Sequence, residues 1–189
     1  VEVSSAFDTQ VQRSSFILGT SRQQAEAYAL SIQKIAASYG IAPSKQADGI
    51  VRIAQATKDL ATQQKLAADA AQLAAVSGEN YGQVVDDLIR IQSAFGLKAS
   101  DSGRILDTLA TQFAAVPSSM KENIDLLERL GAVAEVAGLS MEQIGPLAAR
   151  VAQDANSTLS TTANLFTRVS ENLGNLDTLK ALNRQGITA

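Results

Sequence analysis

The sequence predicts an all-α fold, a compact bundle of about eight short helices that are separated by Gly, Pro and Ser turns, without a sheet. Helical segments end four times at a glycine followed by an aliphatic residue, at Gly40-Ile41, Gly96-Leu97, Gly138-Leu139 and Gly186-Ile187. Glycine readily takes the left-handed conformation that closes a helix, and the aliphatic residue folds back onto the last turn. No segment alternates with the period of two that is typical of half-buried strands.

The first half of the chain carries four amphipathic segments. Residues 1–19 are an N-terminal lead-in. Their pattern of apolar residues is ambiguous and allows a helix around Phe7 and Val11. A helix is predicted over 20–39, because Tyr28, Ile32, Ile35 and Tyr39 follow at spacings of four, three and four. Ser21 with Gln24 is predicted to form the capping box of this first helix, and Pro43 and Ser44 to begin the second. A third helix is predicted from about Asp59 to Val76, and Asn80 with Gln83 is predicted to cap the fourth.

The second half continues in the same way. A fifth helix is expected over 100–115, and Pro117 blocks its continuation. Ser119 with Glu122, and Ser140 with Gln143, predict two further capping boxes. Gly145-Pro146 lies too deep for a first turn, so we expect a kink or a later helix start there. The remaining apolar positions of the last stretches are Leu159, Ala163, Phe166, Val169, Leu173, Leu176, Leu179 and Leu182.

These elements suggest a helical core module at 20–173 and a C-terminal helix and turn at 174–189 that lead to the rest of a longer parent chain. The start at Val1 without a methionine also suggests an excised piece. A serine or threonine after each glycine cap is placed to cap the next helix; these are Ser44, Ser100, Ser140 and Thr188. The four glycine caps are unevenly spaced, which argues against a repeat array.

Composition excludes several function classes. The 189 residues hold 16 basic and 19 acidic side chains, for a net charge of -3, and no basic cluster that would read nucleic acid. Histidine and cysteine are absent, so disulfides, thiolate nucleophiles, imidazole bases and the usual zinc ligands are excluded together. No apolar run reaches the roughly 18 residues that a membrane-spanning helix needs, and no signal peptide is recognisable.

Two serine motifs and two acidic groups are candidate sites of chemistry. Ser31-x-x-Lys34 and Ser118-x-x-Lys121 match the S-x-x-K pattern of serine acyl enzymes, but the K-T-G motif of those enzymes is missing. We therefore interpret both as chance matches by residues on a helix surface. In the acidic groups, Asp86 lies four residues before Arg90 and Lys121 four before Asp125. This spacing favours solvated ion pairs on a helix surface over a metal site. The first group is Asp86 and Asp87, and the second is Glu122, Asp125 and Glu128. We therefore expect no catalytic, cofactor-binding or metal-ligating residue.

Three further patterns favour structural interpretations. Asn156-Ser157-Thr158 fits the glycosylation sequon, but a loop or helix cap is the better interpretation. Gly78 and Gly82 form a G-x-x-x-G spacing around polar residues, which indicates a turn between helices. The alanine-rich stretch 66–76 suits either packing within the chain or self-association with another copy.

Five blocks, taken in order, resemble the core region of phage tail tape measure proteins of the TP901 type. They are Phe7-Asp8, YGIAPSKQADGIVRIAQA from Tyr39, LAADAAQLAAVSGENYGQVVDDL from Leu66, IQSAFGLKASDSGRILDTLATQF from Ile91, and VAEVAGLSMEQIGPLAARVA from Val133. The chain departs from the family pattern at Pro146, and again at Asn156, which stands where a glycine turn is usual. Asn156 can also take the left-handed conformation. Residues after Asn172 fall outside the clear match.

The resemblance implies a virion structural protein that scaffolds the tail tube, sets tail length and is released on genome delivery. It implies several copies in the tail lumen, assembly in the host cytoplasm, and tail tube, tail tip and assembly chaperone proteins as partners. It implies no enzyme and no cofactor in this region. The turns indicate a compact module rather than a continuous rod. The alternative is a non-viral helical protein–protein interaction module.

Overall fold

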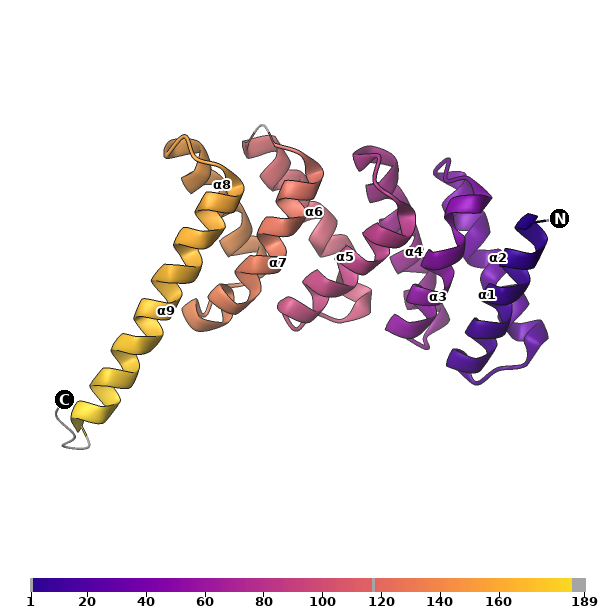
Figure 1. Cartoon of the computed structure of the whole chain (residues 1–189), viewed down its shortest axis with the longest axis horizontal. Coiled ribbons are helices and arrows are strands. Elements are labelled where there is room, and N and C mark those ends of the chain that lie inside the picture. Colours follow the sequence, from indigo (N-terminus) through magenta and orange to yellow (C-terminus); the bar gives the residue numbers. More distant parts are fainter. Residues whose placement is uncertain (1, 117, 185–189) are drawn as a thin grey trace. The chain divides into compact units, whose positions relative to one another are not determined.

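The regular secondary structure of the described part of the chain is entirely helical. The computed structural model describes the backbone of residues 2–116 and 118–184, and the side chains of residues 5–116 and 118–172. Within these ranges it contains nine α-helices, two short 3₁₀ helices and no strand (Figure 1). The prediction of an all-α fold of short helices without a sheet is confirmed.

The described residues form two compact units, which divide between Leu106 and Asp107. Helix α6 crosses this division, so unit 1 holds its first residues and unit 2 the others. The partition of the chain at residues 20 and 173 stays a prediction. The elements are α1 (Glu2–Leu18), α2 (Arg22–Ser38), η1 (Pro43–Lys45), α3 (Ala47–Ala56), α4 (Leu60–Ser77), α5 (Tyr81–Ala94), η2 (Ala99–Asp101), α6 (Ser102–Ala115), α7 (Met120–Ala137), α8 (Met141–Asp154) and α9 (Leu159–Arg184).

The predicted glycine caps are confirmed at three positions. Gly40, Gly96 and Gly138 have φ of 80°, 62° and 67°. The next residue in each case donates its N–H to a carbonyl of the preceding helix, which is the hydrogen bond of a Schellman cap. The bonds run from Ile41 to Ala36 (3.2 Å), from Leu97 to Gln92 (2.8 Å) and from Leu139 to Ala134 (2.9 Å). Gly186 lies outside the described residues.

Three more turns use a left-handed residue. Gly19, Gly78 and Asn156 have φ of 65°, 74° and 49°. Asn156 replaces glycine in a turn of the same kind, since the N–H of Ser157 bonds the Ala152 carbonyl at 2.9 Å. The expectation that Asn156 preserves this turn is confirmed. Together with the breaks between α3 and α4 and between α6 and α7, these turns give a helix break about every twenty residues, far more evenly than four glycines alone indicate.

The helix starts confirm some predicted caps and correct others. Ser21 with Gln24 and Ser119 with Glu122 form capping boxes, and the Asn80 side chain accepts from the amides of Gly82 and Gln83. The cap predictions for Ser44 and Ser100 are wrong, because both residues lie within the 3₁₀ turns η1 and η2, which delay the next α-helix. Helix α3 begins only after Gln46, and α6 begins at Ser102. Thr188 lies outside the described residues.

The structure bears on two predictions of helix boundaries. The lead-in is helical from Glu2 to Leu18, as α1. Of the two alternatives at Gly145-Pro146, the later helix start is wrong, because α8 begins at Met141 and contains Pro146, whereas the kink stays a prediction. Its first turn is fixed by the Ser140 N–H, which donates to the Gln143 Oε1 at 2.9 Å. Pro117 lies outside the described residues.

Unit 1 is built around the small side chains of α4. This helix contacts α2, α3 and α5, and its alanine-rich face is buried against them. The alanine-rich stretch therefore packs within the chain. The buried side chains of this face are Leu66, Ala67, Ala70, Ala71, Leu73 and Ala74.

Helices α3 and α5 come close together where glycine leaves room for a tyrosine. The Tyr81 ring lies against Gly49, where an ideal Cβ would be 2.3 Å from the Tyr81 Cε1. The Tyr81 hydroxyl donates to the Ala67 carbonyl at 3.4 Å, and the Tyr28 hydroxyl donates to the Ile50 carbonyl at 2.7 Å. Both buried phenols therefore have a partner.

Unit 2 packs α7 against α8 and α9, and α8 against α9. Its core alternates aliphatic side chains with alanines, and Gly145 of α8 lies beside α6 and α7. An ideal Cβ at Gly145 would be 2.6 Å from the Gln112 Nε2 and 3.0 Å from the Leu127 Cδ2. The small residue thus permits this close approach.

Candidate functional site

The hydroxyls of both S-x-x-K motifs form local structural hydrogen bonds. The Ser31 Oγ donates to the Tyr28 carbonyl at 2.8 Å, within helix α2. The Ser118 Oγ donates to the Val116 carbonyl at 3.1 Å and accepts from the Asn123 Nδ2 at 2.8 Å. These bonds tie the serines to a helix and to the turn before α7, as is usual for serine at such positions.

The acidic candidates form ion pairs and caps. In place of the predicted pair of Asp86 with Arg90, Asp86 pairs with Arg52 of α3, and Arg90 pairs with Asp87, whose side chain is 4% exposed. The Gln83 Nε2 also donates to the Asp87 Oδ1, at 2.8 Å. Among the residues that the structure describes, no three His, Cys, Asp or Glu side chains gather as metal ligands would.

The second acidic group lies along α7. The predicted pair of Lys121 with Asp125 is confirmed, with the Nζ 3.2 Å from the Oδ1. The Glu122 carboxylate accepts from the Ser119 N–H at 2.8 Å and from its Oγ at 2.9 Å. Glu128 lies further along the same helix. The group thus includes a helix cap and a surface ion pair.

One polar cluster has no local sequence signal. The Asp69 Oδ2 of α4 accepts from the Lys65 Nζ at 2.7 Å and from the Ser102 Oγ at 2.5 Å. Ser102 is fully buried at the start of α6. Because Asp69 and Ser102 are far apart in the sequence, helix spacing alone does not bring them together. The cluster joins α4 to the start of α6.

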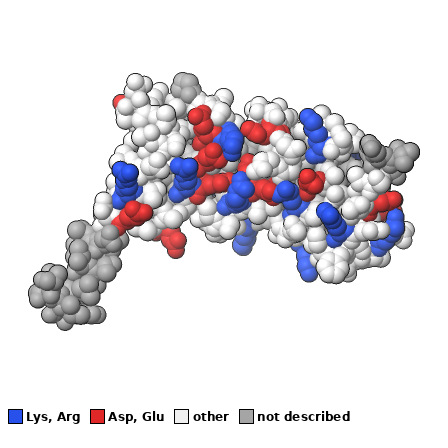
Figure 2. Space-filling model, viewed as in Figure 1, with Lys and Arg blue, Asp and Glu red and all other residues white. Residues whose placement is uncertain are grey.

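Charge is mixed over the surface that Figure 2 shows. Basic and acidic side chains alternate on this face, without a region of one sign. The described helices also include none with the length and hydropathy of a membrane-spanning segment. This face therefore lacks the electrostatic footprint of a site that follows a phosphate backbone.

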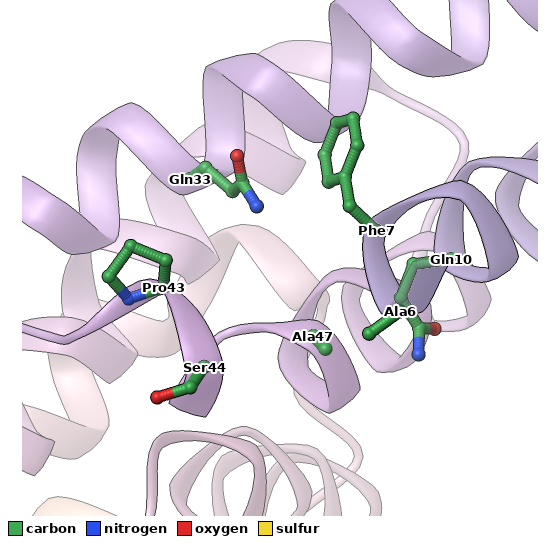
Figure 3. A pocket seen from close by; sticks show the side chains of 7 residues that line it. All are labelled: Ala6, Phe7, Gln10, Gln33, Pro43, Ser44 and Ala47. Atoms are coloured by element: carbon green, nitrogen blue, oxygen red, sulfur yellow. The ribbon is translucent and has the colours of Figure 1, made fainter. Parts of the chain in front are cut away.

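Two hollows lie beside α1. On one side of this helix lies a cavity of about 210 Å³, to which α1 contributes from one side and α2, η1 and α3 from the other (Figure 3). A shallow groove of about 500 Å³ lies further along α1, between α1 and α3. The cavity is lined by Ala6, Phe7, Gln10, Gln33, Pro43, Ser44 and Ala47, and the groove by Gln12, Arg13, Phe16, Ile17, Val51 and Gln55.

Unit 2 has a groove of its own, between α8 and α9. It has a volume of about 410 Å³ and mixes apolar and hydroxyl side chains, among them Val151, Thr161 and Leu165. Leu165 is 52% exposed and Val169, one turn further along α9, is 50% exposed. The groove therefore lies beside exposed aliphatic side chains of α9.

The shifted pKa values have structural causes. Burial raises the pKa of Tyr28 and of Tyr81, and the nearby Tyr81 phenol raises that of Tyr28 further. Hydrogen bonds from Thr62 lower the pKa of Asp59, and those from Ser119 lower the pKa of Glu122. The two tyrosines belong to the core, and the two carboxylates to helix N-termini.

Comparison with known proteins places the chain in a family. The model of the phage-related minor tail protein family matches residues 7–189. Comparison with curated proteins gives no match, and neither does comparison with solved structures. The family match begins at Phe7, in α1, and includes every later helix. On this evidence, the chain belongs to the family of phage-related minor tail proteins.

Proposed function

We propose that this chain is part of a tape measure protein of a phage or phage-derived tail. In this role it scaffolds assembly of the tail tube, contributes to tail length and leaves the tube when the genome is delivered. The observation that carries the proposal is the family match over residues 7–189. The ordered blocks that resemble TP901-type tape measure cores point in the same direction.

The helical structure is consistent with a module within a ruler. A helix rises about 1.5 Å per residue, so 189 residues in one helix would span roughly 280 Å. The described helices are much shorter, and α4, with 18 residues, spans about 27 Å. Because the chain turns at Gly40, Gly96 and Gly138, this segment contributes far less length than an uninterrupted helix would.

The role that we propose is structural and not enzymatic, and needs no cofactor. The chain has no histidine or cysteine, and the serines of its two S-x-x-K motifs hydrogen-bond within the fold. Its partners would be tail tube and tail tip proteins, assembly chaperones and further copies of itself. It would occupy the tail lumen after assembly in the host cytoplasm.

The test uses a phage or prophage that encodes the parent chain. An in-frame duplication of residues 1–184 is introduced, and tail lengths are measured by electron microscopy. Tails are expected to lengthen reproducibly, by less than about 1.5 Å per added residue because the segment is folded. A double substitution, Ser31→Ala with Ser118→Ala, serves as the control and is expected to leave length and infectivity unchanged.

Two results would contradict the proposal. Tails of unchanged length that contain the duplicated chain would show that this segment does not contribute to length. Absence of the unmodified parent chain from purified tails, measured by mass spectrometry, would favour the non-viral interaction module instead.

A further inference from the structure

Helix α1 is held to the rest of unit 1 by few apolar side chains. Among its described side chains only Gln10, Val11 and Ser14 are buried, and only one of these is aliphatic. Helix α2, of the same length, buries Tyr28 and Ile32 together with three alanines. Burial of apolar area normally provides most of the free energy that holds a helix in place. Because α1 buries few apolar side chains, its attachment to the rest of unit 1 gains little from this source.

Two polar atoms that α1 buries at this contact lack hydrogen-bond partners within the described part of the chain. The Gln10 Oε1 and the Ser14 Oγ are buried without a hydrogen-bond partner among the described residues. Buried polar atoms without partners weaken a contact, and both atoms regain partners in water when the contact opens.

The surface that α1 covers is incompletely filled. We call this surface the α1 seat; it includes Gln33 of α2, Pro43 of η1, and Ala47 and Val51 of α3. The cavity of about 210 Å³ lies at this seat (Figure 3). The groove of about 500 Å³ lies further along α1, against Val51 and Gln55. Unfilled volume at a contact means lost dispersion contacts on both sides.

The connection from α1 to α2 is a short turn that can serve as a hinge. Gly19 has φ of 65° and is exposed, and the Thr20 N–H donates to the Ser15 carbonyl at 3.1 Å. The ion pair between Asp8 and Arg22 spans the two helices, but its side chains are 56% and 61% exposed. An exposed pair of this kind adds little attachment.

We propose that α1 is an exchangeable helix, which leaves its seat by opening of the turn at residues 19–21 and is replaced there by α1 of a second copy. The seat fits this occupant, because the α1 of another copy offers the same side chains that already pack on it. The exchange repeats an existing contact and needs no new surface. The inference concerns unit 1 and is independent of the tail function.

The first experiment compares two glycine variants that differ only in which turn they strain. Gly19→Ala and Gly78→Ala each place a Cβ at a left-handed φ, and neither Cβ would meet another atom within 4 Å. Only the first turn joins α1 to α2. Light scattering after size-exclusion chromatography, from low to high micromolar protein, is expected to show several-fold more dimer for Gly19→Ala than for Gly78→Ala. An equal dimer fraction in the two variants would overturn the proposal.

Hydrogen exchange of the unaltered chain tests whether α1 opens separately. The amides of α1 are expected to exchange several-fold faster than those of α2, because the seat opens while the rest of unit 1 stays folded. Equal protection of α1 and α2 would overturn the proposal.

A cross-linking experiment identifies the occupant. The chain has no cysteine, so single substitutions give unambiguous products. Chains that carry Asp8→Cys are mixed with chains that carry Arg22→Cys, at the two ends of the 3.1 Å ion pair, and treated with a short thiol cross-linker. The yield of covalent heterodimers is expected to be higher than in a control mixture of Asp8→Cys chains with Asp154→Cys chains. Asp154 lies in unit 2. Equal yields in the two mixtures would overturn the exchange.

Discussion

At the scale of single residues, Gly49 determines how closely α3 and α5 approach. A Cβ at this position would be 2.3 Å from the Cε1 and 2.6 Å from the Cδ1 of Tyr81, an aromatic ring that is itself buried. We expect Gly49→Ala to lower the free energy of unfolding of unit 1 by about 1 to 3 kcal/mol, because the ring and the backbone must separate. Urea denaturation followed by circular dichroism measures the change.

Gly103 offers the matched control. A Cβ there would be 2.8 Å from the Nζ of Lys65, the far end of a flexible side chain that can move aside. Because alanine is the better helix former by about 1 kcal/mol, Gly103→Ala is expected to be neutral or stabilising. Equal destabilisation by the two substitutions would show that the Tyr81 contact is not the cause.

The fully buried Gln112 side chain has neither of its amide atoms paired among the described residues. Methionine has a similar length and no such amide. We expect Gln112→Met to raise the free energy of unfolding of unit 2 by about 1 to 2 kcal/mol, since the desolvation cost of the amide is removed. Thermal denaturation tests this, with Gln153→Met on the exposed side of α8 as the control. A loss of stability would mean that the Gln112 amide has a partner in the folded protein.

At the scale of helices, the capping box at the start of α7 stabilises unit 2. We expect Ser119→Ala to cost about 1 kcal/mol at neutral pH, because the amide of Glu122 loses its acceptor. The Ser119 hydrogen bonds lower the pKa of Glu122, so their contribution is present above the unfolded value of about 4.3 and is lost as the pH falls through the lower folded pKa. The difference in free energy of unfolding between Ser119→Ala and the parent chain should therefore become smaller as the pH falls.

Urea denaturation at neutral and at acid pH measures this difference. Ser93→Ala, an exposed position within α5, is the control and is expected to change stability by less than about 0.5 kcal/mol. A difference that grows in acid would contradict the assigned role of the Glu122 carboxylate.

The same helices show which features the sequence can predict. Capping boxes and Schellman turns depend on residues three to six positions apart, so Ser21, Gly96 and Ser119 were correctly assigned from local patterns alone. The 3₁₀ turns at η1 and η2 were missed, because a serine after a glycine cap looks the same whether or not an extra turn precedes the helix. Helix α1 has too few buried apolar side chains to give a clear stripe.

Contacts between distant residues escaped prediction for a different reason. The Asp69 and Ser102 pair, the partnership of Asp86 with Arg52, and the fit of Tyr81 onto Gly49 all depend on which helices pack together. Local periodicity gives the face of a helix but not its neighbour. The alanine-rich face of α4 was recognised, whereas its burial against α2, α3 and α5 required the structure.

At the scale of the whole molecule, stability should depend on alkaline pH through the core of unit 1. Burial raises the pKa of Tyr28 and of Tyr81 above the usual value of about 10. The stabilisation is complete below that unfolded value and is lost as the pH rises toward the folded values. The expected slope approaches about 1.4 kcal/mol per pH unit for each tyrosine.

Urea denaturation across this alkaline range measures the slope. The variants Tyr28→Phe and Tyr81→Phe each remove one of the two phenols, so each should make the dependence on pH shallower. An unchanged slope in both variants would assign the alkaline loss of stability to other groups.

The order of helix contacts in each unit has a consequence for how the protein is made. Packing joins α1 to α2 and α3, α2 to α4, α3 to α5, and α7 to α8 and α9, so partners are never far apart along the chain. Short separations make closure of each contact fast, since little chain must be ordered first. Each helix meets its partners soon after it emerges from the ribosome, and folding can proceed from the N-terminus during synthesis without waiting for the last residues.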